Sequence, residues 1–136
     1  MKIEIDHEPV PQLRPRATRI GNSIRLYDPK KVSLYKTFVK YAGKQQYKGD
    51  LLTSPLSVEI IFYRPIPKSE SKKRKLLMES KEILPIVKPD IDNYTKAVLD
   101  ALNDVVWKDD SQIVELVAKK YYSEKPRTEI YFSEVE

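Results

Sequence analysis

Residues 90–116 read DIDNYTKAVLDALNDVVWKDDSQIVEL, and this stretch decides the fold. Apolar residues recur there at helical spacing: Val98, Ala101, Leu102 and Val105. This stripe predicts an amphipathic helix, and Asp92 or Asn93 is placed to cap its first turn. The β-branched run that follows predicts a strand from Ile113 to Tyr122.

The flanking sequence supplies the other predicted elements. Strands are predicted at residues 2–6, 56–63 and 128–132, and helices at residues 32–45 and from near Ser69 or Ser71. LSVEIIFY, residues 56–63, is typical of a central strand, and residues 113–122 and 128–132 are expected to pair as an antiparallel hairpin. The order of elements predicts an α+β domain with helices packed on a mixed sheet.

Length and composition narrow the class of protein. At 136 residues with 40% hydrophobic side chains, the chain fits one globular domain. It has no cysteine and one histidine, which excludes disulfides, thiolate zinc sites and histidine clusters. No stretch has the length of a membrane span or the pattern of a signal peptide, so we expect a cytoplasmic protein without membrane association.

The positive charge is concentrated in the first two thirds of the chain. Residues 1–88 carry 19 basic against 9 acidic side chains, whereas residues 89–136 carry 6 against 11. The prolines of residues 9–31 disfavour a helix and predict an extended loop that displays Arg14, Arg16, Arg19 and Arg25. Such a loop is suited to nucleic acid phosphates, although solubility alone also explains a basic surface.

Six aspartates lie between residues 90 and 110, and such crowding is costly without cations. Asp90 and Asp92 stand at the entry to the predicted helix, and a returning chain could bring Asp109 or Asp110 to them as a third ligand. Carboxylate oxygens suit Mg²⁺, which polarises phosphodiesters and activates water. Lys96 follows Asp92 by four residues and shares its helical face, where an ammonium offsets charge on a phosphoryl group.

Each of these residues also has a structural interpretation. Asp92 can be a helix cap, Asp92, Lys96 and Asp100 can form a charged stripe, and Asp109–Asp110 can be a turn. Asp100 and Asp104 fit surface positions, and Trp107 fits the core better than a base-stacking role. A sugar transferase with a D-x-D metal site is a further alternative, but the chain has no glycine-rich nucleotide loop.

The stretch KPDIDNYTKAVLDALNDVVWKDDSQIVEL, residues 88–116, resembles the signature of the RusA family of Holliday junction resolvases. The matching features are the D-x-D-N pair, a lysine four residues after its second aspartate, the A-x-L-D-A-L helix and the D-D-x-Q strand entry. LRPRATR and RLYDPKK resemble the basic loop of phage-type members. The resemblance covers most of the chain and is weakest over residues 65–87.

The resemblance implies a single RusA-like domain over residues 1–136, a homodimer and paired nicking of four-way DNA junctions in recombination and repair. By position it implies Asp90, Asp92 and Asp110 as ligands of Mg²⁺, with Mn²⁺ as a substitute, and Lys96 as the essential lysine. Asp109 could share the role of Asp110. Arg14, Arg16 and Arg25 are the candidates for phosphate contacts. The alternative is a catalytically silent junction-binding protein of prophage origin.

Overall fold

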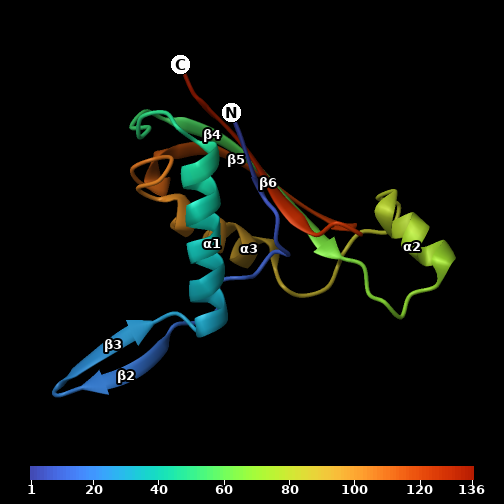
Figure 1. The fold of residues 1–136 in the computed structure, drawn as a ribbon, viewed down its shortest axis with the longest axis horizontal. Coiled ribbons are helices and arrows are strands. Elements are labelled where there is room, and N and C mark those ends of the chain that lie inside the picture. The colour runs from blue at the N-terminus through green and yellow to red at the C-terminus, as the bar shows by residue number, and fades with distance from the viewer.

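The computed structural model describes residues 1–136, and its centre is a four-stranded mixed sheet (Figure 1). The strands are β1 (Lys2–Ile5), β4 (Leu56–Pro65), β5 (Ile113–Ser123) and β6 (Arg127–Glu134), and their order is β1-β6-β4-β5. β4 pairs with β5 in parallel and with β6 in antiparallel orientation. The predicted α+β class and the central position of the 56–63 strand are confirmed.

The predicted hairpin between the last two strands is wrong. β5 and β6 are consecutive and separated by three residues, but both pair with β4, which lies between them. Tyr63 is the partner of Tyr121 on one side and of Arg127 on the other. The short loop therefore crosses the end of β4, a long-range arrangement that the spacing of the two strands does not reveal.

Three α-helices accompany the sheet: α1 (Lys30–Gln46), α2 (Lys72–Glu79) and α3 (Ile91–Leu102). The prediction for α2 is confirmed, since the Ser71 hydroxyl accepts a hydrogen bond from the Arg74 amide as its N-cap. The predicted cap of α3 is wrong: Asp90 is the N-cap residue, in an extended conformation and without a side-chain capping bond. None of the helices is both long and apolar enough to cross a membrane.

Helices α1 and α3 cover one face of the sheet and form the core with it. Val32, Tyr35 and Val39 of α1 and seven residues of α3 are buried, in contact with inward residues of β1, β4 and β6. Gly43 allows the two helices to approach, because a Cβ there would lie 2.8 Å from Leu102 Cδ2. Trp107 is completely buried and donates from Nε1 to Asn103 Oδ1, as expected for a core residue.

Residues 16–27 form a hairpin where an extended loop was expected. β2 (Arg16–Ile20) and β3 (Ser23–Tyr27) pair antiparallel, and all ten of their residues are exposed. Gly21 turns the chain with a φ of 59°, a conformation that glycine adopts at no steric cost. Figure 1 shows this hairpin, hereafter the basic arm, and α2 projecting from opposite sides of the body.

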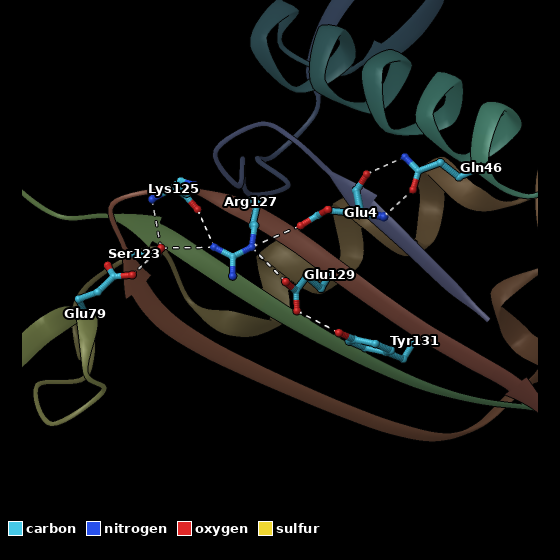
Figure 2. Close-up of polar contacts among 8 residues, drawn as sticks. All are labelled: Glu4, Gln46, Glu79, Ser123, Lys125, Arg127, Glu129 and Tyr131. Atoms are coloured by element: carbon cyan, nitrogen blue, oxygen red, sulfur yellow. Dashed lines mark hydrogen bonds and ion pairs between the residues drawn. The ribbon is translucent and has the colours of Figure 1, made fainter.

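The other face of the sheet carries a polar network around Arg127 (Figure 2). The Arg127 Nε lies 3.0 Å from Glu129 Oε2 and 3.4 Å from Glu4 Oε1, and Tyr131 donates to Glu129 at 3.1 Å. Burial raises the pKa of Glu129, but the hydrogen bonds from Arg127 and Tyr131 outweigh it and the pKa is lowered. Nearby, the Glu79 carboxylate of α2 accepts from the Ser123 hydroxyl and the Glu124 amide.

Replacing Arg127 should destabilise the fold in a pH-dependent way. The folded pKa of Glu129 is depressed, so its contribution is present above the ordinary value of 4.5 and is lost as the pH falls through the folded pKa. Arg127→Met should cost about 1–3 kcal/mol at pH 7, because it leaves a poorly solvated carboxylate without its partner, and clearly less at an acidic pH below the folded pKa of Glu129. Urea unfolding at both pH values measures this difference.

Lys119→Met provides the control on the same face of the sheet. Lys119 pairs with Glu59 at 3.0 Å, but both side chains are well exposed, so its loss should cost under about 0.5 kcal/mol at either pH. Equal costs for the Arg127 variant at pH 7 and at the acidic pH would contradict the assigned role of Glu129.

Candidate active site

Asp90 and Asp92 lie together at the start of α3. Asp90 is the residue that precedes the helix and Asp92 is in its first turn, where the free backbone N–H groups favour negative charge. Both side chains are exposed to solvent. The Lys88 ammonium donates to both carboxylate oxygens of Asp90, at 2.8 and 3.0 Å, and this contact raises the pKa of Lys88. The pair is therefore accessible and has a cation beside it.

The segment before α3 is held against the far end of β5 by Lys120. The ammonium of Lys120 donates to the carbonyl oxygens of Val87 and Pro89, at 3.0 and 3.1 Å. Burial and the nearby Arg64 lower the pKa of Lys120. This contact fixes Asp90 near Lys120. Lys120 is seven positions after Ile113, the first residue of β5.

Lys96 lies one turn after Asp92 on α3, as the sequence predicts, and its side chain is 63% exposed. It lines an open cavity of about 550 Å³ between the base of the basic arm, α1 and α3. The charged residues of this cavity are Arg14, Asp28, Lys36, Lys96 and Asp100. The Lys96 ammonium is 3.8 Å from the Asp100 carboxylate, too long for a strong charge-assisted hydrogen bond.

Asp109 and Asp110 stand at the opposite end of β5. Asp109 caps a 3₁₀ turn, η1 (Asp110–Gln112): its carboxylate accepts from the Ser111 amide, and Gln112 Oε1 accepts from the Asp109 amide. The hydrogen bonds from Ser111 lower the pKa of Asp109. The Asp110 side chain has no such partner, which leaves its carboxylate available for other contacts.

The two acidic pairs are far apart within one chain. Asp110 precedes Ile113, whereas Asp90 is tied to Lys120, and seven residues of β-strand span roughly 23 Å. Accordingly, no three acidic or histidine side chains of the chain form a group that could hold a metal ion. The expectation that the chain returns Asp110 to Asp90 and Asp92 is not met within one molecule. Asp90 and Asp92 offer two hard oxygen donors, which fit two of the ligands of Mg²⁺ but do not complete them.

The arginines predicted to contact DNA are all accessible. Arg14 lines the cavity beside Lys96, and Arg16 and Arg25 belong to β2 and β3 of the basic arm. Residues 9–27 include four arginines and no carboxylate, and none of the four forms an ion pair. The arm is therefore an uncompensated cationic surface.

The structure also shows the surroundings of Asp104 and Asp100, which the sequence predicts to lie at the surface. Asp104 is exposed and adopts a left-handed turn conformation with a φ of 62°, in agreement with a surface position. Asp100 is also at the surface, with its side chain 30% exposed, and it forms the i,i+4 pair of the charged stripe with Lys96 at 3.8 Å, but its carboxylate also lies 3.5 Å from Lys36 of α1. Sequence reasoning missed the roles of Lys36, Lys88 and Lys120, and only Lys88, next to the D-x-D pair, has a local signal.

Comparison with known proteins identifies the family of this chain. The model of the family described as endodeoxyribonuclease RusA matches residues 6–132. The chain is 42% identical over 137 residues to the uncharacterized protein YqaN of Bacillus subtilis (strain 168), covering 99% of this chain and 96% of that one. It is 29% identical over 138 residues to the crossover junction endodeoxyribonuclease rusA of Lactococcus phage r1t, covering 98% and 96%. The chain therefore belongs to the RusA family and is an endodeoxyribonuclease.

Proposed function

We propose that this protein is a Mg²⁺-dependent resolvase that nicks four-way DNA junctions. The observation that carries the proposal is the start of α3, where Asp90 and Asp92 are exposed and Lys96 follows one turn later in the lining of an open cavity that also includes Arg14. The relationship to the phage crossover junction enzyme supports the choice of substrate. Mn²⁺ is the expected substitute for Mg²⁺.

The aspartates and lysines of the site have different roles in the proposed reaction. Asp90, Asp92 and Asp110 would hold the metal ion, which when bound polarises the phosphodiester and lowers the pKa of water. Lys96 places an ammonium where negative charge develops on the phosphoryl group. Lys88 pairs with Asp90, so a bound metal ion would compete with the Lys88 ammonium for this carboxylate. Asp109 remains the cap of the 3₁₀ turn and orients its neighbour.

Removing the charge of Asp92 or of Lys96 should strongly slow cutting and leave junction binding nearly unchanged. Asp92→Asn should lower the nicking rate on a fixed four-way junction by about a thousandfold, and Lys96→Ala by about a hundredfold, since each removes a preorganised charge. Junction affinity in EDTA should change by less than about threefold, because most affinity comes from phosphate contacts.

Asp104→Asn is the matched control for this comparison. Asp104 is an exposed turn residue on the same connection, and asparagine tolerates its left-handed conformation. Wild-type cutting by Asp92→Asn would exclude this site, and a wild-type protein that binds junctions but never nicks them with Mg²⁺ would favour the silent binding protein.

We further propose that the active protein is a homodimer formed along β5. β5 is an edge strand, so its outward N–H and C=O groups have no partner strand. Val114, Leu116 and Val117 are 61%, 47% and 49% exposed, an unusual run of aliphatic side chains at a sheet edge. Consecutive side chains of a strand point to opposite faces of the sheet. Because Leu116 and Val117 are both exposed, both faces of this strand are uncovered.

A twofold pairing of β5 with β5 of a second copy would complete the metal site. In an antiparallel pair centred on Val117, Glu115 of one copy lies opposite Lys119 of the other, so the start of β5 in one copy runs beside Lys120 in the other. Asp110 precedes Ile113, and Asp90 is tied to Lys120, so the pairing carries each Asp110 toward the other copy's Asp90 and Asp92. Such a dimer has two equivalent sites, which suits a junction that needs two related cuts.

Mixing two inactive variants tests this shared site. In a heterodimer of Asp92→Asn and Asp110→Asn subunits, one of the two sites combines an unchanged Asp92 with an unchanged Asp110. The mixture should therefore nick junctions at roughly a quarter of the wild-type rate, since about half of randomly mixed dimers are heterodimers with one active site. Each variant alone should be inactive, and a mixture as inactive as its components would place all three aspartates of a site in one subunit.

The basic arm would hold the DNA by its phosphates. Four arginines without a carboxylate among residues 9–27 form a charge pattern complementary to a duplex, and a two-stranded β-ribbon has the width of a DNA groove. We assign Arg14, Arg16 and Arg25 to phosphate contacts that fix the position of the junction without reading its sequence. If the enzyme cuts branched DNA as proposed, its role would be in recombination and repair in the cytoplasm.

Arginine substitutions in the arm should weaken binding in a salt-dependent way. Arg16→Ala and Arg25→Ala should each reduce the slope of log affinity against log salt concentration by about one, as expected for one lost phosphate contact. Lys48→Ala, an exposed change of the same charge just beyond α1, should leave the slope unchanged. Fluorescence anisotropy with a labelled junction in EDTA measures the slopes, and equal slopes for all three variants would remove the arm from the DNA interface.

A further inference from the structure

A row of four alternating charges connects the base of the basic arm to Lys96. Its members, in order, are Asp28, Lys36, Asp100 and Lys96. The Lys36 ammonium donates to Asp28 Oδ2 at 2.9 Å and lies 3.5 Å from Asp100 Oδ2. The Lys96 ammonium is 3.8 Å from the same Asp100 oxygen. Two lysines thus compete for one carboxylate oxygen.

Lys36 is the better placed of the two competitors. Its side chain is 20% exposed, against 63% for Lys96, so water screens its charge less. Lys36 is also fixed from behind by Asp28, whose other oxygen accepts a hydrogen bond from Gln12 Nε2 at 2.9 Å. The hydrogen bond from Lys36 is the main reason that the pKa of Asp28 is lowered, so this anchor stays charged.

Lys96 and Asp100 have the spacing of a helical ion pair. They are four residues apart on α3, within reach of each other, in the lysine-first orientation that is the weaker one for such a pair. Lys36 adds to the long distance between them, because it binds the Asp100 oxygen that faces Lys96. If Lys36 were neutral, nothing else within ion-pair distance would keep Asp100 from binding Lys96 fully.

We infer that Lys36 is a positioning residue that keeps Lys96 available to the DNA by occupying Asp100. The inference rests on the proposed role of Lys96 at the scissile phosphate. Because Asp28 lies directly after β3 and Gln12 precedes β2, the same row ties both ends of the basic arm to the helix that carries Lys96. The Gln12 amide adds a second tie, since it donates to the Asn93 carbonyl of α3 at 2.8 Å.

A double-variant rescue tests the inference on the full-length protein. Lys36→Met should lower the single-turnover nicking rate at saturating junction and Mg²⁺ by about three- to fivefold, the scale of one partly exposed ion pair. Junction affinity in EDTA should not change, because Lys96 acts on the reacting phosphate. The double variant Lys36→Met/Asp100→Asn should recover the lost rate, because the carboxylate that captures Lys96 is then gone.

The controls separate positioning from packing. Lys36→Arg keeps the charge and should keep the wild-type rate, whereas Lys36→Gln should match Lys36→Met, so a misfit of methionine cannot explain the loss. Lys44→Met, two turns along α1 at an exposed position without an ion pair, should leave the rate unchanged.

Two results would overturn the inference. One is a wild-type rate for Lys36→Met, and the other is a double variant as slow as the single one while both melt at the wild-type temperature. Failure of the proposed function is a different observation, namely that the wild type does not nick junctions or that Lys96→Ala nicks them normally.

Discussion

The parallel pairing of β4 with β5 is the constraint on which the rest of the structure depends. Two parallel neighbours require the chain to return along the sheet between them, and α3 makes this return against the core face. A connection of this kind has its two ends at opposite ends of the sheet. Asp90 precedes α3 and Asp110 follows it. The topology itself therefore separates the Asp90–Asp92 pair from the Asp109–Asp110 pair. The proposal that a second copy completes the metal site rests on the same pairing, because Asp90 and Asp110 do not meet within one chain.

Local sequence patterns predict the elements of this fold but not all of their neighbours. The stripes of α1 and α3 and the β-branched runs of β4, β5 and β6 identify these elements to within a few residues, since burial of one face requires them. The strand that β5 and β6 each pair with was not predictable in this way. Both pair with β4, which lies some fifty residues earlier in the chain. The hairpin at residues 16–27 did have a signal in Gly21–Asn22 between two short alternating runs, which the surrounding prolines obscured.

In the candidate site, too, the sequence predicts the local features but not the long-range contacts. The D-x-D pair and the lysine one turn later follow from helical spacing, and the structure places them together at the start of α3. The contacts that control these groups come from distant parts of the chain: Lys36 from α1 and Lys120 from the last third of β5. Charges on separate elements meet only after folding, so no spacing rule identifies them. Asp100 illustrates the difficulty, since its position on an exposed helical stripe conceals that two lysines share its oxygen.

The uncovered edge of β5 also bears on how the protein avoids polymerising. An exposed aliphatic strand is a template for open-ended stacking of chains, in which identical residues lie above one another in register. Such stacking would place Glu115 on Glu115 and Lys119 on Lys119, and repulsion between like charges opposes it. In the proposed antiparallel pair centred on Val117, Glu115 lies opposite Lys119, so opposite charges meet. The charges within this strand therefore favour the proposed closed pair over a growing fibril.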